Sequence, residues 1–148
     1  MSTYQTVPPA NMTDREIVEQ VIAFLRVQGK QCDDGYGSCV YERADGRRCA
    51  AGALLNETQA ALIGHRNVGL GMICNDHPEI ARWFGIQMTE ADPHGSYDER
   101  QRRVDCTGKR YQLMATLQSI HDQPSNWNEW GLKPSAIAEL RSIPALRG

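Results

Sequence analysis

The chain has 148 residues, of which 41% are hydrophobic and 23% are charged, and its formal net charge is −2. These values are typical of one globular domain, and the net charge does not favour nucleic acid as a partner. No apolar run in the sequence reaches the roughly 18 residues of a membrane helix, so we expect no membrane partner. Residues 1–12 lack the features of a signal peptide, and we expect a disordered lead before a single domain over 13–148.

The five cysteines stand at positions 32, 39, 49, 74 and 106. An odd number of cysteines without an export signal predicts reduced thiols and a cytoplasmic location.

The first predicted helix spans residues 13–29. Thr13 is a suitable N-cap, Glu16 completes a capping box, and Gly29 is a typical C-terminal stop. Helical spacing places a core stripe on one face of this helix, formed by Ile17, Val21, Phe24, Leu25 and Gln28.

A β-hairpin is predicted over about 39–51. The strand-like runs 39-CVYER-43 and 47-RRCAA-51 flank Asp45-Gly46, a pair that favours a tight turn because the turn needs positive φ. A two-stranded hairpin is marginal alone, so this one must pack on helices.

The rest of the chain predicts mainly helices and loops. We expect a helix over 50–64 with a break near Asn56, an irregular stretch over 65–75, and a helix over 76–85 capped by Asp76. A long surface loop follows over 89–108, then a helix over 109–122 and a short helix over 134–143 that begins at Pro134. The predicted fold class is therefore α+β, mostly helical, with one small hairpin.

Several short motifs occur together in a fixed order. They are 28-QGK-30, Cys39-x-Tyr41, 45-DGRRCAAGALL-55, 117-LQSIHD-122 and a tryptophan, Trp127 or Trp130, before the last helix. In this combination the chain resembles a group of small uncharacterised proteins of tailed bacteriophages and prophages. The resemblance implies a phage or prophage origin and action in the host cytoplasm, and it supplies no catalytic residues.

Anion binding by the hairpin is the first candidate function. Arg43, Arg47 and Arg48 lie near the turn, and alternation places Tyr41 and Arg43 on one face of their strand. Arginine suits phosphate and carboxylate groups, and a tyrosine ring offers a stacking face. His121 is added as a ligand-binding candidate. The competing interpretation is a solvated hairpin whose arginines are neutralised by acidic neighbours; the basic run 100-RQRRVDCTGKR-110 is likewise interpreted as a solvated loop.

Cysteine chemistry is the second candidate. Cys49 lies where a strand meets a helix, a position that lowers a thiol pKa, and His121 could serve as its base. Adjacent helical residues point about 100° apart, so Asp122 is not expected to orient His121. The alternative interpretation is a buried thiol.

Metal binding is the third candidate, with Cys32, Cys39, Cys49 and His121 as a zinc set. The spacing lacks the closely spaced cysteine pairs of structural zinc sites, so buried thiols and no cofactor are the competing prediction.

These observations lead to a non-enzymatic binding protein as the predicted function. It would act as a phage counter-defence factor that sequesters a small anionic, nucleotide-like ligand or blocks a host defence protein. Because small binding proteins often bury ligands between protomers, the predicted assembly is a homo-oligomer. The alternatives are a cysteine-dependent hydrolase using Cys49 and His121, and a small zinc-stabilised structural protein.

Overall fold

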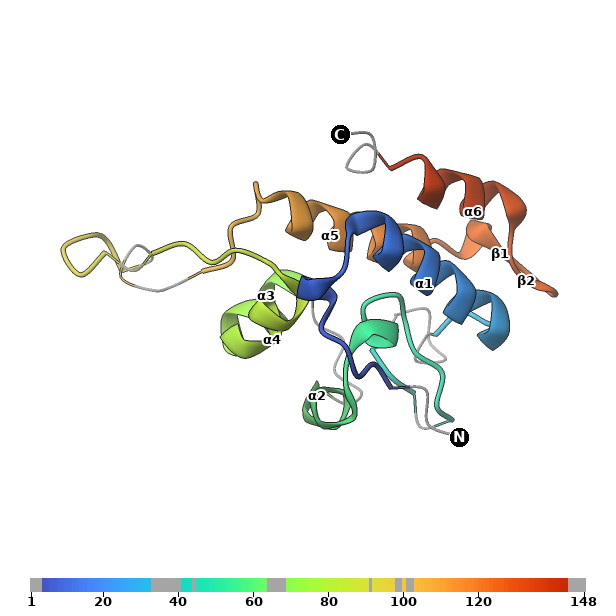
Figure 1. Cartoon of the computed structure of the whole chain (residues 1–148), viewed down its shortest axis with the longest axis horizontal. Helices are drawn as coiled ribbons and strands as arrows, with labels where there is room; N and C mark the ends of the chain where they lie inside the picture. The colour runs from blue at the N-terminus through green and yellow to red at the C-terminus, as the bar shows by residue number, and fades with distance from the viewer. Residues whose placement is uncertain are drawn as a thin grey trace.

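The structure is a computed structural model of the whole chain (Figure 1). It describes residues 4–32, 41–43, 45–63, 69–90, 92–97, 100 and 103–143.

Helix α1 (Asp14–Gln28) is built as its sequence predicts. The Thr13 side chain accepts a hydrogen bond from the Glu16 N–H, the Glu16 carboxylate accepts one from the Thr13 N–H, and Gly29 ends the helix at φ 73°. The residues of α1 that are buried are Ile17, Val18, Val21, Ile22 and Leu25.

Three C-terminal elements pack against this buried stripe. They are helix α5 (Lys109–Asp122), the two-stranded sheet of β1 (Trp127–Asn128) and β2 (Gly131–Leu132), and helix α6 (Pro134–Arg141). Contacts of α1 with α5, β2 and α6 form one side of the core. Figure 1 shows α1 and α5 crossing the middle of the molecule, with α6 on one side of them and the central part of the chain on the other. Both helices were predicted at these positions.

The β1–β2 hairpin was not predicted. Trp127 pairs with Leu132 and Asn128 with Gly131, so the chain reverses at Glu129 and Trp130. Gly131 has φ 115°, and a Cβ there would lie 3.2 Å from the backbone oxygen of Gly29. Only glycine allows this close approach at such a φ, which fixes the hairpin against the end of α1.

The predicted 39–51 hairpin is reduced to one antiparallel bridge in the described residues. Glu42 pairs with Arg48, the Arg43 N–H donates to Arg47 O at 2.7 Å, and Gly46 adopts φ 91° in the turn. The turn itself is confirmed, whereas Cys39 lies outside the described residues. The mostly helical α+β class is confirmed, with β1–β2 as the two-stranded sheet.

The segment after the turn breaks at Asn56, as predicted. A 3-10 helix, η2 (Gly52–Leu54), precedes helix α2 (Glu57–Ile63). The Asn56 side chain accepts from the Gln59 N–H at 2.8 Å and Gln59 returns the interaction, which starts α2 afresh.

Two predictions for residues 65–85 are wrong. Leu70–Asp76 forms a helix, α3, within the stretch that we expected to be irregular, because Leu70, Ile73 and Cys74 bury one face of it. Asp76 ends α3 and does not cap helix α4 (Pro78–Phe84), whose N-cap is His77. Gly85 ends α4 as predicted, with φ 83°.

The described residues of the 86–108 segment, 86–90, 92–97, 100 and 103–108, extend from the helical body after α4 (Figure 1). At its base Met88 bridges Val104, and the Thr89 N–H donates to Arg103 O. A long surface loop was predicted here, and its base is a paired strand-like stem.

Residues 4–12 differ from the expected disordered lead. The Tyr4 hydroxyl donates to Glu42 at 2.7 Å, the Gln5 N–H donates to Leu55 O at 3.1 Å, and Pro9–Asn11 forms a 3-10 helix, η1.

Arg110 joins this N-terminal segment to the core. Its guanidinium donates to Asp14 Oδ1 (2.9 Å) and to three carbonyl oxygens, those of Pro9 (2.8 Å), Met12 (3.0 Å) and Phe84 (2.7 Å). The sequence placed Arg110 both at the start of the 109–122 helix and in a basic run interpreted as solvated. The helical position is confirmed, whereas the solvated interpretation is wrong, because the side chain is only 17% exposed.

No helix among the described residues has the length and apolarity needed to cross a membrane.

We expect Arg110→Ala to lower the free energy of unfolding by about 3 kcal/mol, because it removes several hydrogen bonds made by a charged group and leaves their acceptors unsatisfied. Arg110→Lys should recover only part of this, since an ammonium group cannot reproduce the planar fork. Urea unfolding measures both. The control is Arg82→Ala on the exposed side of α4, expected within about 0.5 kcal/mol of the parent; equal losses for Arg110→Ala and Arg82→Ala would contradict the assignment.

Candidate functional site

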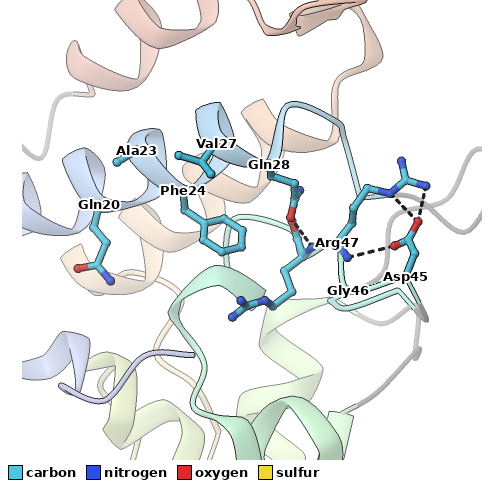
Figure 2. Close-up of a pocket in the computed structure, with 9 residues that line it drawn as sticks. Gln20, Ala23, Phe24, Val27, Gln28, Asp45, Gly46 and Arg47 are labelled. Carbon is cyan, nitrogen blue, oxygen red and sulfur yellow. Dashed lines mark hydrogen bonds and ion pairs between the residues drawn. The ribbon is translucent and has the colours of Figure 1, made fainter. Parts of the chain in front are cut away.

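A groove of about 550 Å³ lies between α1 and the 45–48 turn, and we call it the turn groove (Figure 2). One wall is the flank of α1 next to its buried stripe, formed by Gln20, Ala23, Phe24, Val27 and Gln28. The opposite wall is formed by Asp45, Gly46, Arg47 and Arg48. This volume is in the range of small-molecule sites.

Gln28 holds the turn against α1. Its amide accepts a hydrogen bond from the Arg48 N–H at 2.8 Å and donates to Arg48 O at 2.9 Å. The side chain thus pairs with the backbone of Arg48 as a neighbouring strand would. Figure 2 shows Phe24 and Gln28 extending from α1 towards the turn.

Arg48, in the turn wall of the groove, is only 5% exposed. Its guanidinium carbon lies 4.4 Å from the centre of the Tyr4 ring and 4.7 Å from that of Phe24, so the cation is held between two aromatic faces. Its Nε lies 3.8 Å from a carboxylate oxygen of Glu42, the same group that binds the Tyr4 hydroxyl. Burial lowers the pKa of Arg48, while Glu42 and Tyr4 act in the opposite direction.

The turn itself carries two arginines around one carboxylate. The Arg47 guanidinium binds Asp45 Oδ2 through Nε and Nη2, both at 2.9 Å, and the Arg43 Nε lies 3.7 Å from the same oxygen. Hydrogen bonds from the Arg47 side chain and backbone hold the pKa of Asp45 below its ordinary value. Asp45 is therefore ionised where both guanidinium groups meet it.

The structure separates the predicted ligand-binding residues. Arg47 and Arg48 line the turn groove, and Arg43 meets Asp45 beside it. Tyr41 is 5% exposed and burial raises its pKa, so its ring is part of the core and presents no stacking face. A Cβ at Gly52 would collide with Tyr41 O, which shows how closely this backbone is packed.

His121 lies outside the turn groove, buried at 1% exposure at the end of α5. Its Nδ1 is 2.9 Å from Asp122 Oδ1, and its Nε2 accepts from the Cys32 N–H at 3.3 Å. The prediction that Asp122 could not orient His121 is wrong, because the Asp122 carboxylate turns back to the ring at the last turn of the helix. The Gln118 amide also donates to this carboxylate, at 2.7 Å.

Cys49 does not have the surroundings of a nucleophile. The thiol is fully buried, and burial raises its pKa, outweighing the hydrogen bond from the Gly52 N–H at 3.2 Å. The sequence predicted the opposite shift from a helix N-terminus. In the structure the element that follows is the short helix η2, and desolvation dominates.

The zinc hypothesis involves one residue outside the described part of the chain, Cys39. Within the described residues no group of three or more His, Cys, Asp or Glu side chains is arranged to hold a metal ion. The two ring nitrogens of His121 are engaged by Asp122 and Cys32, so zinc ligation would have to break one of these hydrogen bonds.

The α1 wall of the turn groove was missed by sequence reasoning. Phe24 and Gln28 were assigned to the core stripe, whereas both are only half-buried, and Val27 is 89% exposed. The available signal is a second stripe at helical spacing, formed by Gln20, Ala23, Phe24 and Val27, which is apolar enough to line a groove.

Comparison with models of protein families found no match, and searches of curated proteins and of solved structures found none. The resemblance to phage proteins therefore stays a prediction.

Thiol reactivity should follow exposure. The four described cysteines are reduced, and Cys106 alone among them is exposed. Burial raises the pKa of Cys32 and of Cys74 to about 12, so both remain protonated at mildly alkaline pH and lack the reactive thiolate. In an alkylation time course read by peptide mass mapping, we expect Cys106 to be modified well before Cys32, Cys49 and Cys74 in the folded protein, and all at similar rates in urea. Rapid labelling of Cys49 in the folded state would contradict this expectation and support the cysteine-hydrolase alternative.

Zinc should not be needed for folding. Because both His121 ring nitrogens already have partners, we expect a chelator to leave the thermal midpoint unchanged. If elemental analysis found one zinc per chain and chelation unfolded the protein, the zinc-binding alternative would be correct instead.

Proposed function

We propose that the protein is a non-enzymatic binding protein that holds a small anionic ligand with an aromatic or apolar body in the turn groove. The observation that carries this proposal is the Arg47 guanidinium at one end of a groove whose α1 wall is largely apolar. A nucleotide-like molecule has the matching division into a flat body and a charged group.

Arg47 is the residue best placed to meet the anion. Its guanidinium uses three donor interactions within the described residues, two to Asp45 and one to Gln31 O at 3.2 Å. An arginine side chain has five N–H donors, so it retains capacity for a second acceptor. Since the ligand shares this cation with Asp45, the affinity should depend on ionic strength.

The apolar body of the ligand would lie on the α1 wall. Val27 and Phe24 present aliphatic and aromatic surface there, and the Arg48 guanidinium packs on the Phe24 ring. Covering this surface removes it from water, which favours binding by about 25 cal/mol per Å².

The setting of this function comes from the sequence resemblance alone. In an infected cell the protein would act in the host cytoplasm as a counter-defence factor, by sequestering a signalling nucleotide or, in the second form of the proposal, by blocking a host defence protein. The cysteine-hydrolase alternative gains no support from the burial of Cys49.

A thermal-shift screen of cyclic and ADP-ribose-type nucleotides tests the proposal. A ligand that binds only the folded state, at 100 times its Kd, stabilises it by about 2.7 kcal/mol. We expect at least one compound to raise the midpoint by roughly 5–10 °C. Arg47→Ala and Val27→Glu should each weaken that compound at least about tenfold, since they remove the anion contact and place a like charge on the apolar wall.

Each variant has a matched control outside the turn groove. Arg82→Ala on α4 removes an exposed arginine, and Met72→Glu on α3 charges a side chain that is 55% exposed. Both should bind as the parent does. If no compound shifts the midpoint, or if the groove variants and their controls bind alike, ligand sequestration is wrong and only the protein-blocking form survives.

A further inference from the structure

A second groove lies on the other flank of α1, against α6, and we call it the α6 groove. It consists of two adjoining hollows of about 520 and 560 Å³ that share Arg26, Pro134 and Ile137. The first also touches the β1–β2 hairpin through Asn128, Trp130 and Leu132, and the second continues along α6 past Ala138, Arg141 and Ser142. The shared residues make the two hollows one elongated surface.

The helical period of α6 explains why this surface is open. Ala136 and Leu140 are buried in the core, and residues Pro134, Ile137, Ala138 and Arg141 share another face of the helix. That face is apolar along most of its length: Pro134 and Ala138 are exposed, and Ile137 is half-buried where it packs against the core.

Trp130 stands at the hairpin end of the α6 groove and is 82% exposed. Its position is fixed by its own backbone, because its N–H donates to Asn128 Oδ1 at 2.8 Å and the following Gly131 is packed on Gly29. Trp127, three residues earlier, instead buries part of its ring and donates its indole N–H to His121 O at 2.8 Å. An exposed indole on a fixed turn is the kind of residue that dominates protein–protein contacts.

The charged side chains that line the groove are arginines. Arg26 and Arg141 line it, and among the described residues that do so there is no carboxylate. Arg141 is held by Glu19 through two contacts, at 2.9 and 3.1 Å, which fixes its guanidinium beside the groove. Since Glu19 pairs with Arg141, Arg26 supplies the net positive charge among these three side chains, and a local positive charge on a chain of net charge −2 favours an acidic partner.

We propose that the α6 groove is a docking surface for an acidic segment of a partner protein, anchored by a large apolar side chain that packs on Trp130 and Ile137. The acidic side chains of the segment meet Arg26 and Arg141. A peptide fits these observations better than a nucleic acid, because the lining is mainly apolar and carries only two cations. The proposal is independent of the turn groove.

Selection from a random peptide library against the immobilised full-length protein is the test. We expect the selected pool to be enriched in Asp and Glu together with aromatic or leucine residues. Trp130→Ala should weaken a selected synthetic peptide by at least about thirtyfold, the loss that defines a dominant interface residue. Arg26→Glu should weaken it at least about tenfold and should reduce its salt dependence.

The matched controls are Tyr97→Ala, which removes another exposed aromatic ring, 68% exposed, and Arg82→Glu, which reverses an exposed charge on α4. Both should bind as the parent does, and Val27→Glu in the turn groove should also leave peptide binding unchanged. All variants concern exposed side chains, so their thermal midpoints should match that of the parent.

Four outcomes would overturn the proposal. They are a pool with no acidic enrichment, a selected peptide that binds Trp130→Ala and the parent equally, binding of single-stranded DNA that Trp130→Ala removes, and a concentration-dependent dimer that Trp130→Ala dissociates. A fifth would also overturn it: if a protein ending at Ile143 binds the selected peptide much more tightly than the full chain does, the segment after Ile143 competes with the peptide for the groove.

Discussion

Burial of the Ile17–Leu25 stripe of α1 is the constraint on which the rest of the structure depends. This one face packs on α5, β2, α6 and η2, elements that lie far apart in the sequence. Side chains on the two flanks of an α-helix point away from its buried face, so α1 offers one flank to the 45–48 turn and the other to α6. Both grooves therefore share a helix as a wall, and each is held in place by the same core.

The two sides of the turn are joined by a single bridge, between Glu42 and Arg48, which is too little to keep the turn folded by itself. Side-chain contacts with α1 stabilise it. Gln28 satisfies the backbone of Arg48 on one side, and the rings of Tyr4 and Phe24 enclose its guanidinium. This arrangement also attaches the N-terminal segment to the turn, because the Tyr4 hydroxyl donates a hydrogen bond to Glu42. The result is a cation kept in a nearly buried position by aromatic faces and one carboxylate.

Local signals predicted the elements that depend on nearest neighbours in the chain. The capping box of Thr13, the stops at Gly29 and Gly85 and the turn at Asp45-Gly46 are all confirmed. The sequence could not show which flank of a helix is left open, because that is set by long-range packing. Phe24 illustrates this, because its spacing suits the core stripe, yet its ring packs against the Arg48 guanidinium and lines the turn groove. The β1–β2 hairpin was missed because its turn lacks an Asn-Gly or Asp-Gly pair and its register depends on contact between Gly131 and Gly29.

The cluster of Cys32, Cys49 and His121 shows why residue type alone overstated the chemistry. The sequence suggested His121 as a base for Cys49 and as a zinc ligand with Cys32, Cys39 and Cys49, whereas each polar atom of its ring has a structural partner. The ring joins Asp122 to the backbone of Cys32, and the carbonyl of His121 accepts from Gln31 and Trp127 at the end of α5. These bonds satisfy groups that a helix C-terminus would otherwise leave buried and unpaired. They also connect α5 to the base of the β1–β2 hairpin, so the histidine that seemed catalytic instead helps to hold the hairpin on which Trp130 is displayed.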